Sequence, residues 1–144
     1  MDTAINAFQG TTTGRRPAWS PTEELREIAE ADSGMMPELF SLFLDDSTAR
    51  LQALGSACVR RDFKAVRAQA HSLKGSALQM GAASLASLCA VIELSDPPEP
   101  DRWGPMIRAA SEEFILVRRA MEEYLVNPET AGLTPGSPLN GTLR

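Results

Sequence analysis

Apolar residues recur every three or four positions along four long stretches of the chain, which is the spacing of one buried helix face. These stretches predict helices over about 36–59, 63–80, 82–94 and 102–126, and a shorter helix over about 20–31 precedes them. No stretch alternates apolar and polar residues as a half-buried strand does. Because short segments join the helices, we predict an all-α protein, an antiparallel up-down four-helix bundle with a short additional N-terminal helix.

Residues that start or stop helices separate these stretches. Ser20 and Glu23 form the capping-box pattern S-x-x-E, which predicts Ser20 as the N-cap of the first helix. Asp62 is predicted to cap the third helix, and Gly81 to end it. Four prolines within 95–105 predict a loop before the last helix.

The two ends of the sequence differ in composition from the part between them. Residues 1–17 are polar and rich in Gly and Thr, and 128–144 are rich in Gly, Pro and Thr. We expect the first segment to be a disordered arm and the second a flexible tail. Residues 18–127 are then predicted to form a single folded domain, since this length is enough for a core of its own.

Composition and charge narrow the class of protein. The formal net charge of −5 argues against a general nucleic-acid binder, because affinity for phosphate backbones comes from a basic surface. No stretch approaches the roughly 18 apolar residues that span a bilayer, and the start resembles no secretion signal. Cys58 and Cys89 are too few and too far apart for a disulfide framework or a zinc site. We expect a cytoplasmic protein that binds neither nucleic acid nor membrane, and a monomer, since one bundle uses every apolar stripe.

The chain contains a single histidine, His71, within the third predicted helix. The apolar stripe of that helix consists of Phe63, Val66, Ala70, Leu73, Ala77 and Met80. At about 100° per residue, His71 lies roughly 130° from the centre of this stripe and is predicted to face solvent. Lys74 and Gly75, at i+3 and i+4, share its side of the helix. A glycine inside a helix costs roughly 1 kcal/mol relative to alanine, which suggests that open surface is needed beside the imidazole.

An exposed imidazole can ligate a metal, act as a base or act as a nucleophile. A metal site needs further ligands, and the inward Glu-x-x-His pairs of di-iron bundles are absent. Haem ligation needs an inward-pointing ring, and an acyl-transfer triad needs a strand-turn-helix elbow that this pattern lacks. Phosphoryl transfer fits best, because it depends on positioning and charge, and Lys74 can offset the charge of a phosphorylated ring. We expect no metal and no other cofactor. Taken singly, Lys74 and Gly75 would pass for an ordinary solvated lysine and a small packing residue.

The run Ala70-His71-Ser72-Leu73-Lys74-Gly75-Ser76-Ala77, followed by Met80-Gly81-Ala82, resembles the motif of histidine-containing phosphotransfer (HPt) domains. The likeness extends over about residues 20–126. It implies that His71 accepts a phosphoryl group from the aspartate of a response-regulator receiver domain and passes it to another receiver. The partners would be receiver domains and a hybrid sensor histidine kinase in a multistep phosphorelay. The resemblance also implies a transfer intermediate without ATP binding, autokinase activity or a metal of its own.

The same resemblance assigns roles to neighbouring residues. Lys74 would stabilise the charge of the phosphorylated ring, and Gly75 would leave clearance for the receiver. Ser76 and Gln79 are expected close to the site as polar neighbours. Glu93, on the following helix, occupies a position where some family members have a glutamine that orients the histidine. It either accepts a hydrogen bond from the ring of His71 or is an ordinary solvent-facing charge.

Basic residues gather on the stretch that leads to the histidine. Five of them, against the single acidic residue Asp62, lie between positions 60 and 74: Arg60, Arg61, Lys64, Arg67 and Lys74. Two interpretations stay open, a docking strip that steers an acidic receiver active site, and an ordinary solvated helix face. Leu78, apolar on the same face, is predicted to contact the partner.

Two other functions stay open beside phosphotransfer. One is a non-transferring adaptor bundle that binds receivers or kinases without being phosphorylated. The other is the isolated phosphorylation module of a chemotaxis-type kinase. The presence of His71 argues against the first, and the tail-like flanks argue against the second.

Overall fold

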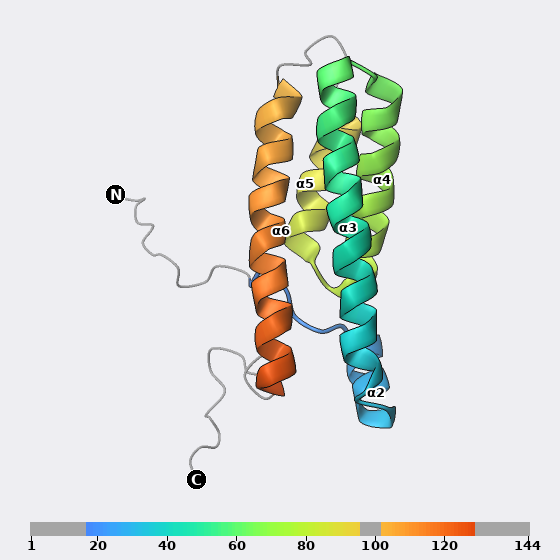
Figure 1. Ribbon diagram of the computed structural model, residues 1–144, viewed down its shortest axis with the longest axis vertical. Coiled ribbons are helices and arrows are strands. Elements are labelled where there is room, and N and C mark those ends of the chain that lie inside the picture. Colours follow the sequence, from blue (N-terminus) through green and yellow to red (C-terminus); the bar gives the residue numbers. More distant parts are fainter. Residues whose placement is uncertain (1–16, 96–101, 129–144) are drawn as a thin grey trace, which may run out of the picture.

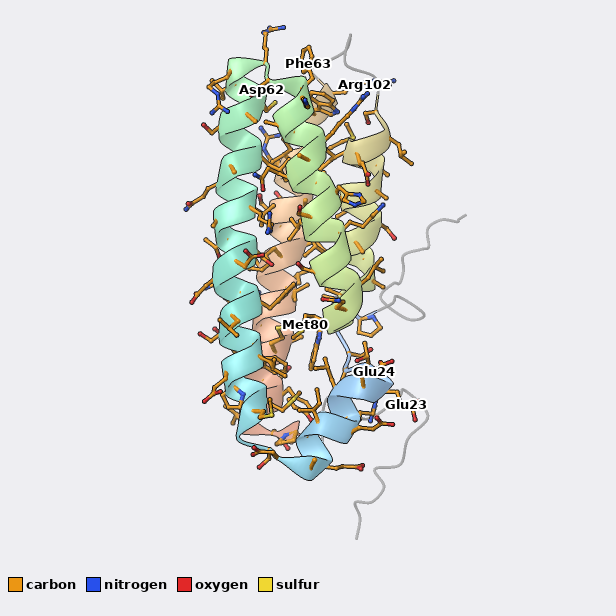
Figure 2. The ribbon with its side chains drawn as sticks, turned by 90° about the vertical axis from the view of Figure 1, so that its right-hand side faces the viewer. Glu23, Glu24, Asp62, Phe63, Met80 and Arg102 are labelled. Carbon is orange, nitrogen blue, oxygen red and sulfur yellow. The ribbon has the colours of Figure 1, made fainter. Side chains whose placement is uncertain are left out.

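The structure, a computed structural model, describes residues 17–95 and 102–128 (Figure 1). These residues form five α-helices and no strand: α2 (Glu23–Ala31), α3 (Met35–Arg60), α4 (Phe63–Met80), α5 (Ala83–Leu94) and α6 (Trp103–Val126). Helices α3 to α6 run alternately up and down, and α2 lies at the end of the bundle where α3 begins (Figures 1 and 2). The predicted fold class is confirmed.

The predicted arm, except for Pro17, and the predicted tail, except for Pro128, lie outside the described residues. The limits 18–127 of the folded domain therefore stay a prediction. None of the helices in the described ranges is long and apolar enough to cross a membrane.

The four long helices pack in a ring in which each contacts two neighbours: α3 with α4, α4 with α5, α5 with α6, and α6 with α3. The predicted stripe of α4 faces the centre of this ring, where Val66, Ala70, Leu73 and Ala77 are fully buried. Phe63 and Met80, at the two ends of the stripe, are partly buried and pack against the core. The 3-4 spacing of apolar residues thus determines which side of α4 faces inward.

The turns on either side of α4 match their predicted limits. Asp62 caps α4, since its carboxylate accepts a hydrogen bond from the backbone N–H of Ala65 at 3.1 Å. Arg61, just before it, ends α3 in the left-handed conformation at φ 57°. Gly81 ends α4 at φ 88°, a conformation that glycine adopts without steric cost.

The predicted start of the first helix is wrong by two residues. Thr22, not Ser20, is the N-cap of α2, and its hydroxyl accepts a hydrogen bond from the backbone N–H of Leu25 at 3.1 Å. Ser20 is held elsewhere, because its carbonyl lies against the turn at Gly81 and would clash with a Cβ added there. The helix begins only after the chain has crossed the end of α4.

Trp19 fixes this crossing segment to the bundle. Its side chain is buried, and its indole N–H donates a hydrogen bond to the backbone carbonyl of Met80 at the end of α4. Its ring also makes edge contacts with Phe40 and Tyr124, with centroids 5.2 and 5.4 Å away. Burial of an aromatic side chain contributes roughly 1.5–3 kcal/mol, so this segment is an integral part of the fold. The helical pattern does not predict the burial of Trp19, because this residue precedes the first predicted helix.

Candidate functional site

His71 lies on the outer side of α4, next to residues of the core. Its side chain is 67% exposed, whereas the preceding residue, Ala70, is fully buried. The helical phase worked out from the sequence therefore predicted the exposure of the imidazole correctly. A ring in this position can be reached by a second protein without any movement of the bundle.

Glu93, on the neighbouring helix α5, contacts both His71 and Lys74. Its Oε2 atom lies 2.8 Å from Nδ1 of His71, and its Oε1 atom lies 2.8 Å from Nζ of Lys74. The Glu93 side chain is only 22% exposed, so its carboxylate is largely shielded from solvent where α5 packs against α4. Of the two interpretations left open for Glu93, the hydrogen bond to the histidine is the one observed.

The carboxylate of Glu93 is held in its charged form. The hydrogen bond from Lys74, and then the one from His71, lower the pKa of the Glu93 carboxyl below its usual value. An ionised carboxylate can only accept hydrogen bonds, so this geometry requires the proton of a neutral imidazole to be on Nδ1. The Nε2 atom then carries the lone pair.

The surface beside the imidazole is open at Gly75. This residue is exposed, and a Cβ added to it would meet nothing within 4 Å. Ser76 is half-buried, and Gln79 lies eight residues after His71, about 12 Å along the helix axis. Glu93, His71, Lys74 and Gly75 are thus brought together, whereas Gln79 lies in a separate hollow near the end of α4.

The five basic residues are not equivalent. Arg67 is half-buried and donates a hydrogen bond from Nη2 to the backbone carbonyl of Ser95 at 2.7 Å, which ties the end of α5 to α4. Lys74, 30% exposed, is paired with Glu93. Arg60 bonds to the hydroxyl of Ser56 on its own helix. Neither interpretation, a docking strip or a solvated helix face, describes Arg67 and Lys74, because both residues hold α5.

Two exposed basic residues remain near the start of α4, namely Arg61 and Lys64. Leu78, near the other end of the helix, is 57% exposed, as its predicted contact with a partner requires. Thr22, the N-cap of α2, and Glu24, in its first turn, lie against this part of α4, which the sequence did not predict. No local signal in the sequence indicates this proximity, because it depends on the path of residues 17–22.

Cys89 lies one turn before Glu93 on α5 and is fully buried. Burial, together with the nearby carboxylate of Glu93, raises the pKa of its thiol to about 12. This cysteine is therefore a small apolar core residue, as expected from its place on an apolar helix face. Within residues 17–95 and 102–128, no three side chains of the metal-binding types cluster.

The geometry and the sequence motif point to the same class of protein, and comparison with known proteins agrees. Residues 38–124 match the profile of the family described as the Hpt domain. The chain belongs to this family and is a histidine phosphotransfer protein of the phosphorelay type. No protein in the curated set matches the sequence.

A solved structure that resembles this chain is the crystal structure of histidine-containing phosphotransfer protein B (HptB) from Pseudomonas aeruginosa PAO1. The two chains share 30% sequence identity with a TM-score of 0.67. The match covers 78% of this chain and 97% of the HptB chain. The similarity therefore extends over nearly the whole of HptB, and beyond the residues that the family profile covers here.

Proposed function

We propose that His71 accepts a phosphoryl group on Nε2 from the aspartyl phosphate of a receiver domain and passes it to the aspartate of a second receiver. The observation that carries this proposal is the Glu93 carboxylate at 2.8 Å from Nδ1, which leaves Nε2 as the nucleophile facing solvent. A hybrid sensor histidine kinase that contains a receiver is the expected source of the group.

The transfer of the phosphoryl group needs no further reactant, because one bond to phosphorus forms as another breaks. The lone pair of Nε2 forms the N–P bond, the P–O bond of the aspartyl phosphate breaks, and its electron pair leaves with the aspartate carboxylate. The phosphorylated ring keeps its proton on Nδ1, and its positive charge then lies against Glu93. Since that carboxylate has a lowered pKa, it keeps this role as the pH falls, and loses it only when the pH passes below the lowered value.

Lys74 supplies the second charge at the site. It lies three residues after His71, and its ammonium group is already held near the ring by Glu93. The phosphoryl group adds negative charge on the solvent side of the ring, and the flexible Lys74 side chain can turn from Glu93 to meet it. The chain itself is proposed to bind no ATP and to have no autokinase activity, so the receiver provides both the phosphoryl group and any metal.

The proposal is tested by incubating the full chain with a receiver domain carrying labelled phosphate. We expect label on the wild-type chain and none on His71→Gln, because the amide of glutamine cannot form the N–P bond. Circular dichroism should show equal helix content, since the exchanged side chain is exposed. An unlabelled wild-type chain would overturn the proposal, and stable binding to the receiver in that case would favour the adaptor.

Two variants of Glu93 distinguish its hydrogen bond to the His71 ring from its ion pair with Lys74. Glu93→Gln keeps an oxygen that can accept from Nδ1–H but loses the ion pair to Lys74, whereas Glu93→Ala loses both. We expect the alanine variant to slow labelling of His71 by roughly tenfold or more, and glutamine to restore part of the rate. Equal rates for the two variants would show that the hydrogen bond to Nδ1 has no positioning role.

The encounter with the receiver should depend on salt. Receiver active sites are acidic, and Arg61 and Lys64 are exposed near the start of α4, ten and seven residues before His71. We expect the rate of label transfer to fall steeply between low salt and physiological salt, where charges are screened within about 8 Å. A rate indifferent to ionic strength would leave these residues as an ordinary solvated helix face.

A further inference from the structure

Two hollows flank Leu78 on the face of α4 that carries the histidine. One lies between α4 and the start of α2 and is lined by Thr22, Glu24, Leu78 and Gln79. The other runs between α4 and α5 and is lined by Lys74, Leu78, Ala83, Ala86, Ser87 and Ala90. Leu78, 57% exposed, is the ridge between them, and Lys74 joins the second hollow to the reaction site. The apolar ridge and the reactive imidazole are therefore parts of one continuous surface.

The charge of this surface changes sign along the bundle. Arg61 and Lys64 are exposed where α4 begins, and Glu23 and Glu24 are exposed in the first turn of α2, beside the end of α4. In Figure 2, Glu23 and Glu24 lie near Met80, at the opposite end of α4 from Asp62 and Phe63. His71 lies between the basic end and the acidic end.

Helix α2 is an addition to the part of the chain that matches the family profile, since that match begins at residue 38. Leu25 is the one fully buried residue of α2, Ile28 and Ala29 pack partly buried against the core, and the opposite side of the helix is exposed. Yet α2 is held in one place, because Trp19 is bonded to Met80 and Ser20 lies against Gly81. The first turn of α2, which carries Glu24, is thus held beside Leu78.

We propose that α2 completes the docking surface for the receiver and selects receivers that carry a basic side chain opposite Glu24. This inference rests on the proposed function. Apolar side chains of the receiver would contact Leu78 and the shallow, small-residue hollow on α5, while a lysine or arginine of the receiver pairs with Glu24. A receiver with an acidic residue at that point would be repelled by the same carboxylate, so Glu24 contributes specificity rather than chemistry.

The test uses the full chain and a panel of purified receiver domains phosphorylated with acetyl phosphate. For the receiver that labels the wild type fastest, we compare Glu24→Lys with Glu30→Lys, which makes the same charge change elsewhere on α2. We expect Glu24→Lys to lower kcat/KM by roughly tenfold, mostly through KM, and Glu30→Lys to change it less than twofold. Labelling by phosphoramidate, a small donor that needs no docking surface, should be equal in all three chains.

Two further comparisons sharpen the test. Leu78→Ala should lower kcat/KM by roughly tenfold, whereas Leu42→Ala, which truncates a leucine 69% exposed on α3, should not. A receiver whose basic residue is changed to glutamate should prefer the Glu24→Lys chain to the wild type. Equal kcat/KM values for Glu24→Lys and Glu30→Lys, with the wild type well labelled, would overturn this inference alone. Failure of every receiver to label the wild type would overturn the proposed function as well.

Discussion

Replacement of Gly75 is expected to strengthen the fold and weaken the function at the same time. Gly75 lies inside α4, where glycine costs about 0.5–1 kcal/mol relative to alanine. A methyl group added there meets no atom within 4 Å, so alanine brings no clash that would offset this gain. Gly75→Ala should therefore raise the free energy of unfolding by roughly 0.5–1 kcal/mol, which corresponds to a Tm higher by about 2–8 °C.

The functional effect should grow with the size of the new side chain. A receiver must bring its aspartyl phosphate to within bonding distance of His71, and Gly75 is the residue one turn further along α4 on the same side. Gly75→Leu is expected to keep the gain in stability but slow label transfer from the receiver by at least about tenfold, equivalent to about 1.4 kcal/mol of lost docking energy. Gly75→Ala should lie between the wild type and leucine.

Urea denaturation followed by circular dichroism measures the first effect, and transfer of label from a phosphorylated receiver measures the second. Gly55→Ala is the matched control, because Gly55 also lies inside a helix, with nothing within 4 Å of an added Cβ. It should be stabilised to a similar degree and transfer label at the wild-type rate. A Gly75→Leu chain that transfers as fast as the wild type would refute the clearance argument. If Gly75→Ala lowers the free energy of unfolding, an added methyl group does clash at this position.

Three other outcomes follow from packing. Gly81→Ala should cost at least about 2 kcal/mol in urea denaturation, because φ is +88° and the new Cβ would meet Ser20; a wild-type midpoint would contradict this. Leu73→Ala, at a fully buried position, should lower the free energy of unfolding by about 2–5 kcal/mol. A loss below about 1 kcal/mol would show that neighbouring side chains move in to fill the cavity. At pH 8, iodoacetamide should alkylate Cys58 before Cys89, because Cys89 is buried and its thiol pKa is about 12. Peptide mass spectrometry measures the order, and early modification of Cys89 would contradict its burial.

The sequence predicted features that depend on one helix at a time. The exposure of His71 and the burial of Leu73 follow from the phase of α4 alone, since an apolar stripe can face only the core. Asp62 was identified as a cap because the residues that define a cap are adjacent in sequence. These predictions needed no knowledge of the neighbouring helices.

Features that depend on two segments could not be decided in the same way. Whether Glu93 meets His71 depends on the rotation of α5 against α4, which tertiary packing sets. Ser20 and Thr22 are both good N-caps, and the choice between them is made by Trp19, which bonds to a residue 61 positions away. Arg67 likewise reaches a carbonyl 28 positions away, although its place in the sequence suggested an exposed charge.

The buried indole of Trp19 has a consequence for how this protein can be observed in solution. The chain has two tryptophans, and they lie at opposite ends of the bundle, Trp19 beside Tyr124 and Trp103 beside Phe63. Fluorescence from a Trp103→Phe chain would come from Trp19 alone, and its emission would shift when the indole leaves the end of α4 for water. Local opening of α2 becomes measurable apart from global unfolding, so stopped-flow mixing with a receiver could reveal whether the N-terminal helix stays docked during phosphotransfer.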